Sequence, residues 1–287
     1  MMSGREKKKH GEKRRKGRRL MTIAILLIFL AGLLFIFFPT ASNYWNALHQ
    51  SNVITEYTEN AGGLNLADRE RILSAAYEYN EKLFLDGRNE SLHEEYQAQL
   101  DISGQGIMGY IEIPKINCHL PIYHGAEESA LQVAVVHSEG SSLPVGGENT
   151  HCVLFGHRGL PSARLFTDLD QLDKGDLFML CVLNDVMTYE VEQILVALPE
   201  EVEYLSIREG EDLCTLVTCT PYGVNSHRLL VTGRRVENRM EQETADIPAD
   251  DTRIRILPAA AMSVAVLLVI LLISRWICVH RKRKQEL

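Results

Sequence analysis

Two charge-free apolar segments, one near each end of the chain, constrain the architecture more than any other feature. They cover residues 20–38 and 256–274. A helix that rises about 1.5 Å per residue needs about 20 apolar residues to cross the roughly 30 Å hydrocarbon core of a membrane, and each segment is close to that length. We therefore expect two membrane-spanning helices with one folded domain between them.

Each segment has an alternative interpretation. A signal peptide also combines a basic start with an apolar stretch, but that stretch is only about 7–15 residues long, and residues 39–42 form a weak cleavage site. A buried core helix is the alternative for the second segment. Against it, basic residues follow within ten positions, as is typical of a stop-transfer sequence: Arg275, Arg281, Lys282, Arg283 and Lys284. Spanning helices are the favoured interpretation of both segments.

The distribution of charge predicts the orientation in the membrane. Ten Lys and Arg residues lie within residues 1–19, and basic residues favour the cytoplasmic side. We expect the basic tails 1–19 and 275–287 in the cytoplasm, against lipid headgroups, and residues 39–255 outside the cell membrane. This outer part holds 15 Lys and Arg against 35 Asp and Glu, a net charge of −20. Such a charge disfavours binding to nucleic acid.

Residues 39–103 are predicted to form a helical segment followed by a lid-like loop. Apolar residues recur at helical spacing within 66–84, and Asn65 is a suitable N-cap before them. A second helix is expected over 41–60. Residues 85–103 are polar and rich in turn-forming residues, which indicates a loop.

From residue 104 to 238 the sequence changes to short apolar runs broken by Gly, Pro, Asn and Asp. Asn184-Asp185 between two runs is typical of a hairpin turn. Many short strands without alternating helices favour an all-β sandwich or barrel. Residues 239–255 are acidic and are expected to link this domain to the second span. The expected strands cover 109–113, 131–136, 152–155, 177–183, 186–196, 214–219 and 228–232.

The cysteines do not form a disulfide framework. Five of the six lie between the apolar segments, which leaves at least one unpaired. No C-x-x-C motif and no cluster with metal-ligand spacing occurs, so we expect neither a metal nor another cofactor. The five are Cys118, Cys152, Cys181, Cys214 and Cys219, and Cys278 follows the second apolar segment.

Cys219 is the candidate nucleophile. It ends the apolar run 214–219, and Pro221 and Gly223 then turn the chain, so its side chain is expected at the rim of a sheet. The other cysteines fit a buried, structural role better. A reactive thiol needs a nearby cation or base, and Arg228 would face Cys219 across a hairpin. Arginine does not act as a base, so Arg228 would orient the substrate or stabilise an oxyanion.

The acid/base is expected to be a histidine. His157 follows an apolar run and the flexible Gly156, so it also stands at a strand end that opens into a loop. His137 follows an apolar run too and is a close rival. A structural role is the simpler interpretation of either residue, and for the acid/base these patterns favour His157.

Six motifs occur in order across some 130 residues: Gly109-Tyr-Ile-Glu-Ile-Pro114, Leu120-Pro-Ile-Tyr-His-Gly125, Gly156-His-Arg-Gly-Leu-Pro161, Leu165-Phe-Thr-Asp-Leu169, Thr215-Leu-Val-Thr-Cys-Thr-Pro-Tyr-Gly223 and His227-Arg-Leu-Leu-Val231. Together they resemble the sortase family, and within it class C, the pilin-polymerising sortases of Gram-positive bacteria. The resemblance implies a closed sortase-type β-barrel with N-terminal helices and two flanking transmembrane helices. It implies Cys219 as nucleophile, His157 as proton donor and acceptor, and Arg228 as the substrate-orienting group, with His137 structural.

The resemblance also implies an activity. Cys219 would cleave an LPXTG-like sorting signal between Thr and Gly, and the resulting thioester would pass to a lysine amine of a pilin subunit, in pilus assembly. The expected partners are pilins or other surface proteins with C-terminal sorting signals. A thiol hydrolase of the same signals is an alternative, as is a non-catalytic surface scaffold, which would be expected to lose one of the three residues.

One segment departs from the class C pattern. Class C sortases resemble each other in a lid that carries an Asp-Pro-aromatic plug over the catalytic cysteine. Here residues 85–89 read Leu-Asp-Gly-Arg-Asn, which keeps the aspartate and lacks the ring. We therefore hypothesise a weak or absent lid.

Overall fold

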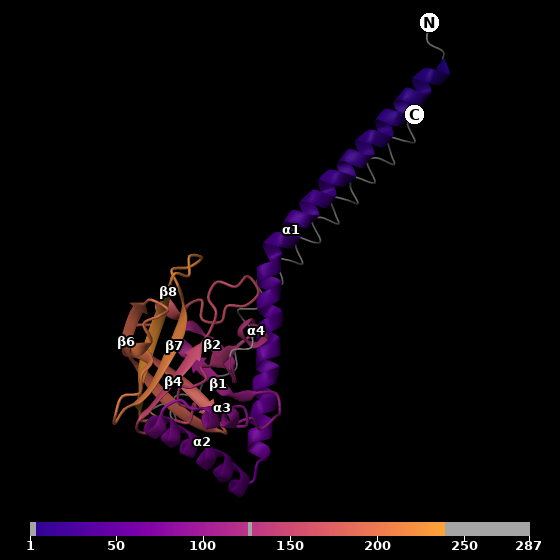
Figure 1. Ribbon diagram of the computed structural model, residues 1–287. Helices are drawn as coiled ribbons and strands as arrows, with labels where there is room; N and C mark the ends of the chain where they lie inside the picture. Colours follow the sequence, from indigo (N-terminus) through magenta and orange to yellow (C-terminus); the bar gives the residue numbers. More distant parts are fainter. Residues whose placement is uncertain (1–3, 126–127, 239–287) are drawn as a thin grey trace. The chain divides into compact units, whose positions relative to one another are not determined.

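The structure is a computed structural model that describes residues 4–125 and 128–238 (Figure 1). These residues divide into two compact units, 4–41 and 42–238. The predicted acidic linker, second membrane span and C-terminal basic tail all fall within residues 239–287 and lie outside the described residues.

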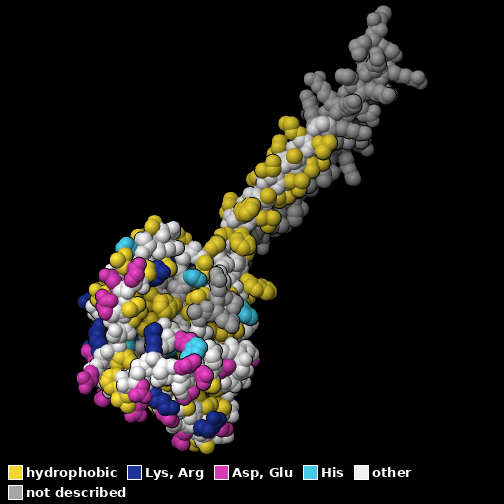
Figure 2. Space-filling model, viewed as in Figure 1, with side chains coloured by type: hydrophobic (Ala, Val, Ile, Leu, Met, Phe, Trp, Pro, Cys, Tyr) yellow, Lys and Arg dark blue, Asp and Glu magenta, His cyan; other side chains and the backbone are white. Residues whose placement is uncertain are grey.

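One helix, α1 (Gly4–Gly63), contains both the first apolar segment and the helix expected over 41–60. From Leu20 it is long and apolar enough to cross a membrane, with a mean hydropathy of 3.0 over an 18-residue window. Hydrophobic side chains cover this stretch of the helix surface (Figure 2). The expected break between span and helix is absent, and Pro39 lies inside the continuous helix.

The predicted helix over 66–84 is confirmed as α2 (Leu66–Asp86). Its N-terminus is capped as expected, since Asn65 Oδ1 accepts a hydrogen bond from the Asp68 N–H at 2.9 Å. Tyr79 and Leu83, four residues apart, are buried on its inner face. This helix therefore packs on the barrel through the apolar stripe that the sequence showed.

The loop predicted over 85–103 is partly wrong, because residues Glu90–Tyr96 form the short helix α3. Asn89 caps it by accepting a hydrogen bond from the Leu92 N–H at 3.0 Å. Leu92 and Tyr96 are buried on one side of it. Two apolar positions in seven residues are too few to show a helical period in sequence.

Eight strands close into a barrel in the order β1-β2-β3-β4-β7-β8-β6-β5, which confirms the expected all-β architecture (Figure 1). The short helix α4 (Glu128–Leu131) and the 3₁₀ turns Pro114–Ile116, Leu169–Gln171 and Val202–Leu205 lie between strands. The strands are β1 (Ile107–Ile113), β2 (Cys118–Tyr123), β3 (Val135–His137), β4 (Thr150–Phe155), β5 (Leu177–Val182), β6 (Asp185–Ala197), β7 (Asp212–Thr220) and β8 (His227–Val236).

Two strand predictions need correction. The strand expected over 131–136 is wrong in its first part, because α4 ends at Leu131 and β3 starts only at Val135. β2 is an additional strand that contains Pro121, a residue without the N–H that a β ladder uses. The hairpin at Asn184 is confirmed: Leu183 and Asn184 form the turn with φ of 49° and 68°.

The pairing of β4 with β7 fixes where the strand ends meet. The two strands are parallel, in a register that runs from Thr150 opposite Asp212 to Phe155 opposite Val217. Their carboxyl ends therefore share one rim of the barrel. β8 begins at this rim and β6 ends there, since Ala197 is opposite Arg228. We call the rim formed by the ends of β4, β6 and β7 and the start of β8 the catalytic rim.

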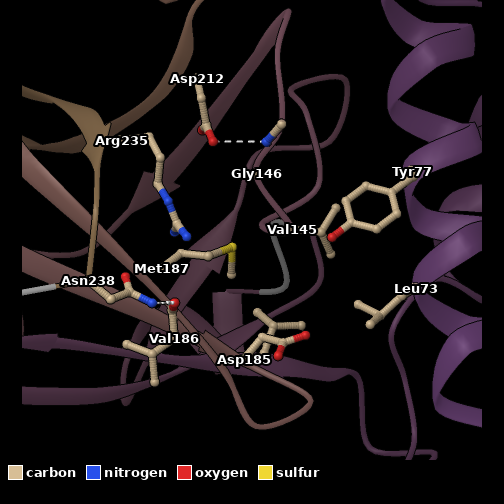
Figure 3. A pocket seen from close by; sticks show the side chains of 12 residues that line it. Leu73, Tyr77, Val145, Gly146, Asp185, Val186, Met187, Asp212, Arg235 and Asn238 are labelled. Carbon is tan, nitrogen blue, oxygen red and sulfur yellow. Dashed lines mark hydrogen bonds between the residues drawn. The ribbon is translucent and has the colours of Figure 1, made fainter. Parts of the chain in front are cut away.

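A pocket of about 370 Å³ lies at the start of β7, away from the catalytic rim (Figure 3). Asp212 and Arg235 line it together with apolar side chains such as Met187. The Asp212 carboxylate accepts hydrogen bonds from the Gly147 N–H at 2.8 Å and the Tyr189 hydroxyl at 2.9 Å. Burial raises the pKa of Asp212, and these hydrogen bonds offset the effect only in part.

The substitution Asp212→Asn is expected to change how stability depends on pH. Because the folded-state pKa of Asp212 lies above its ordinary value of 3.8, the stabilisation it gives is complete below that value and is lost as the pH rises through the folded-state pKa. The Tm of the unsubstituted chain minus that of the variant should therefore fall as the pH rises above 3.8. Thermal unfolding of both chains in detergent at graded pH measures this difference. A difference that does not vary with pH would contradict the prediction.

Candidate active site

Cys219 and Arg228 face each other on neighbouring strands at the catalytic rim. They are paired Cα positions in the antiparallel β7–β8 ladder, and both residues are half-buried. Among the described cysteines, Cys219 is the one that is not buried. The thiol expected at a sheet rim is therefore there, beside the guanidinium that the hairpin argument predicted.

The Arg228 guanidinium is held by backbone carbonyls of its own loop. Its Nη1 donates hydrogen bonds to the Asn225 oxygen at 3.2 Å and the His227 oxygen at 3.1 Å. No carboxylate in the described part of the chain forms an ion pair with it. Its charge and its other N–H groups are thus available to an acyl group bound at Cys219.

His157 lies just beyond the end of β4, where backbone contacts tie that strand to β7. The Gly156 N–H donates to the Val217 oxygen at 3.1 Å, and the Thr218 hydroxyl donates to the Gly156 oxygen at 2.7 Å. Continuing the register of Phe155 opposite Val217 by two residues aligns His157 with Cys219. The three predicted residues are therefore together at the catalytic rim.

Hydrogen bonding separates His157 from the other barrel histidines. In the described barrel residues, 107–125 and 128–238, the His157 imidazole alone has no hydrogen-bonding or ion-pairing partner. His137 is fully buried, with its Nδ1 hydrogen-bonded to the Tyr96 hydroxyl at 2.9 Å and its Nε2 to the Ser142 oxygen at 2.8 Å. The rival histidine is thus occupied and away from solvent.

The loops that follow His157 and Cys219 contact each other through residues that the sequence analysis did not single out. A Cβ on Gly159 would lie 2.8 Å from the Tyr222 ring, and the Arg158 guanidinium carbon lies 6.0 Å from the centre of that ring. Arg158 is also ion-paired with Asp170. No local pattern marks Tyr222 as a neighbour of residue 158, because 64 positions separate them in the sequence.

A small apolar cluster lies on the side of the sheet that carries Cys219. It consists of Val153, Ala197, Val217 and Leu230 and is separate from the main core. Val153 and Val217 are an even number of residues from His157 and Cys219, so they share a face with them. Leu205, in the 3₁₀ turn after β6, packs against this cluster. The site therefore has an apolar floor next to its polar groups.

Residues 85–103, which the sequence analysis compared with a class C lid, contact other parts of the barrel. The Arg88 Nε donates to the Gly140 oxygen at 2.9 Å, and the Tyr96 hydroxyl is bonded to His137. Within residues 4–125 and 128–238, no hydrogen bond or ion pair joins this segment to Cys219, His157 or Arg228. The weak or absent lid stays a prediction, and these contacts are consistent with it.

The described residues contain no group of three or more His, Cys, Asp or Glu side chains that could hold a metal ion. The polar groups at the catalytic rim are instead a thiol, an imidazole and a guanidinium. Such a set can form and break an acyl bond by nucleophilic and acid/base steps.

Comparisons with known proteins agree with this geometry. Residues 111–236 match the sortase domain family. The crystal structure of sortase C1 from Streptococcus agalactiae is similar with a TM-score of 0.63 and 47% identity, and the match covers 65% of this chain and 99% of that one. The chain belongs to the sortase family. Sortases are cysteine transpeptidases.

A second solved structure is also a sortase C. Sortase C from Clostridium perfringens, solved with the C-terminal cell wall sorting motif, is 40% identical with a TM-score of 0.59, over 65% of this sortase and 99% of that chain. Sortase D of Bacillus subtilis (strain 168) is 31% identical over 131 residues, which are 45% of this chain and 63% of that protein's length. The resemblance to class C sortases is confirmed by these structural neighbours.

Gly156→Ala is expected to destabilise this sortase and to disturb the His157 loop. An added Cβ would lie 2.5 Å from the Phe166 ring, and Phe166 is fully buried, so the ring cannot move away freely. Overpacking of this kind costs about 1–3 kcal/mol. Urea unfolding of the full chain in detergent measures the loss. Gly63→Ala is the matched control, since nothing lies within 4 Å of its added Cβ, and an equal loss in both variants would contradict the prediction.

Proposed function

We propose that this sortase is a membrane-anchored transpeptidase of surface proteins that carry a C-terminal sorting signal. Cys219 cleaves an LPXTG-like signal between Thr and Gly, and the acyl group passes to a lysine amine of a pilin subunit. One observation carries the proposal: Cys219 and Arg228 are paired positions on the rim that also holds the unpartnered imidazole of His157.

Cys219 begins the reaction. Its sulfur attacks the threonine carbonyl carbon, and the carbonyl oxygen becomes an oxyanion. Arg228 donates to that oxygen from the neighbouring strand, and its positive charge stabilises the charge that develops there. The absence of a carboxylate partner for Arg228 in the described residues supports this role, because an existing ion pair would compete with the oxyanion.

His157 carries the proton in both half-reactions. It passes the proton of the Cys219 thiol to the departing glycine amine as the tetrahedral intermediate collapses to a thioester on Cys219. It then accepts a proton from the incoming lysine amine, whose attack on the thioester forms an isopeptide bond and frees the thiol. An imidazole without a hydrogen-bonding partner in the described barrel residues is suited to this exchange.

The surroundings of the site suit an extended peptide. The half-buried side chains of Phe155, Leu195 and Leu205, which pack against the apolar cluster, offer a surface for the Leu and Pro side chains of such a signal. The apolar stretch of α1 from Leu20 would anchor the enzyme in the membrane near its membrane-bound substrates. In this arrangement residues 42–238 lie outside the cell.

A product analysis tests the proposal. The full chain in detergent is incubated with a peptide containing a sorting signal and with a lysine-containing acceptor, and products are identified by mass spectrometry. A peptide joined to the acceptor at the threonine supports the transpeptidase. Release of the free acid alone, at any acceptor concentration, would identify a hydrolase, and no cleavage together with an unreactive Cys219 would identify a scaffold.

Cys219→Ala is expected to abolish both cleavage and thioester formation. Its Tm should stay within about 2 °C of the unsubstituted chain, because the side chain is half-buried at a rim and the change removes only one sulfur. Peptide cleavage and thermal unfolding measure the two effects. Turnover above background in the variant would refute the role of this thiol.

Arg228→Lys is expected to lower kcat/KM by about 10²–10³-fold, because an ammonium group does not reproduce the planar set of guanidinium donors. Arg234→Lys is the matched control. Arg234 is also on β8, but it is exposed and ion-paired with Glu192 and Glu211, and this change should leave the rate within about twofold. Equal rates for the two variants would argue against the proposed role of Arg228.

A further inference from the structure

A second pair of cysteines lies on the two strands that lead to His157 and Cys219. Cys152 on β4 and Cys214 on β7 are directly opposite in the parallel register. Cys152 precedes His157 by five positions, and Cys214 precedes Cys219 by five positions. The β4–β7 ladder therefore aligns Cys152 with Cys214 as it aligns His157 with Cys219.

The two pairs lie on opposite faces of the strands. Side chains alternate along a strand, so a spacing of five places them on different sides. Packing agrees: Cys152 and Cys214 belong to the main hydrophobic core, whereas Val153 and Val217 belong to the separate cluster beside Cys219. The core pair is thus out of reach of Cys219 and is not used in acyl transfer.

The neighbours of the two core thiols change their acidity. Cys214 lies directly opposite Cys152, and Cys214 and His137 both act to lower the pKa of Cys152. Burial raises the pKa of the Cys214 thiol well above its ordinary value. Burial would also raise the pKa of Cys152, but the effects of Cys214 and His137 outweigh burial and lower it. Cys152 is therefore the thiol of the pair that loses its proton more readily.

The other buried cysteines of the described chain have no such arrangement. The residue opposite Cys118 is Ile113, and those opposite Cys181 are Tyr110 and Val186. Cys152 and Cys214 are thus the described thiols that a β ladder holds side by side. Directly opposite positions on adjacent strands meet the separation that a disulfide needs.

We propose that Cys152 and Cys214 are a redox modification site that closes to a disulfide between β4 and β7 on reaction with a small hydroperoxide. The Cys152 thiolate attacks one oxygen of hydrogen peroxide, and the O–O bond breaks. Cys152 becomes a sulfenic acid, and hydroxide is released. The Cys214 sulfur then attacks the Cys152 sulfur, the S–O bond breaks, and a second hydroxide leaves. Protons from the two thiols convert both hydroxides to water, so two thiols are oxidised as one peroxide is reduced.

A peroxide is the fitting oxidant because both sulfurs are nearly inaccessible, with Cys152 only 2% exposed and Cys214 0%. A molecule close to water in size can enter during small openings of the barrel, whereas a bulky disulfide reagent cannot. If the barrel lies outside the cytoplasm, as the basic tails lead us to expect, the product would persist there. The bond would join the strands whose ends carry His157 and Cys219.

The experiment uses the full chain with Cys219→Ala, so that the rim thiol does not react. The protein is reduced, freed of reductant in detergent and treated with hydrogen peroxide. We expect the intact mass to fall by two hydrogen atoms and unreduced peptide mapping to show residues 152 and 214 linked. The Tm should rise by about 5–10 °C, because the bond closes a long loop in the unfolded chain, and should return after reduction.

Two further variants serve as controls. Adding Cys214→Ala should abolish the rise in Tm and leave Cys152 as a sulfenic acid, which is detected as a gain of one oxygen atom in the intact mass. Adding Cys181→Ala, a buried cysteine with no thiol opposite it, should leave the disulfide and the shift in Tm unchanged. The proposal would be overturned if Cys152 and Cys214 are both recovered as thiols after peroxide treatment, or if the linked peptides contain other cysteines. The peroxide treatment of the Cys219→Ala chain keeps both core cysteines, so its result does not depend on how the core variants fold. None of these outcomes depends on sortase activity.

Discussion

The parallel pairing of β4 with β7 is the constraint on which the site depends. The two strands are far apart in sequence, and their ladder runs from Thr150 opposite Asp212 to Phe155 opposite Val217. Parallel strands end at the same rim, so residues 157 and 219 meet. An antiparallel pairing would place them at opposite ends of the barrel. In the closed barrel, β3 pairs with the other edge of β4, and β8 pairs with the other edge of β7.

Arg228, the third group of the site, is positioned by a pairing between strands that are neighbours in the sequence. Arg228 is opposite Cys219 because β7 and β8 are joined by a short connection, and the antiparallel ladder then sets the register. The Tyr222 ring of that connection lies against Gly159 and near Arg158, so the hairpin also touches the loop after His157. The site thus combines one short-range and one long-range pairing, and the loop contact connects the two.

The same ladder separates two kinds of sulfur chemistry. At the rim, Cys219 is partly exposed, next to a cation and an imidazole, which suits attack on a large substrate. Five residues earlier, on the other face, Cys152 and Cys214 are enclosed by the core, where only a small oxidant fits. Strand alternation keeps the rim thiol and the core pair apart, so the proposed core disulfide forms without consuming the thiol proposed for acyl transfer.

The sequence by itself determined the class of fold, the apolar segment of α1, the α2 helix with its Asn65 cap, the hairpin at Asn184, and the juxtaposition of Cys219 with Arg228, because each depends on residues close together in the chain. It did not determine α3, whose apolar face has only Leu92 and Tyr96, or the additional strand β2. It favoured His157 over His137 on local pattern, although both follow an apolar run. Tertiary structure decided between them, because packing buries His137 and occupies both of its nitrogens while leaving His157 at the rim. The opposition of Cys152 and Cys214 was likewise fixed only by the long-range register of a parallel sheet, which no local pattern encodes.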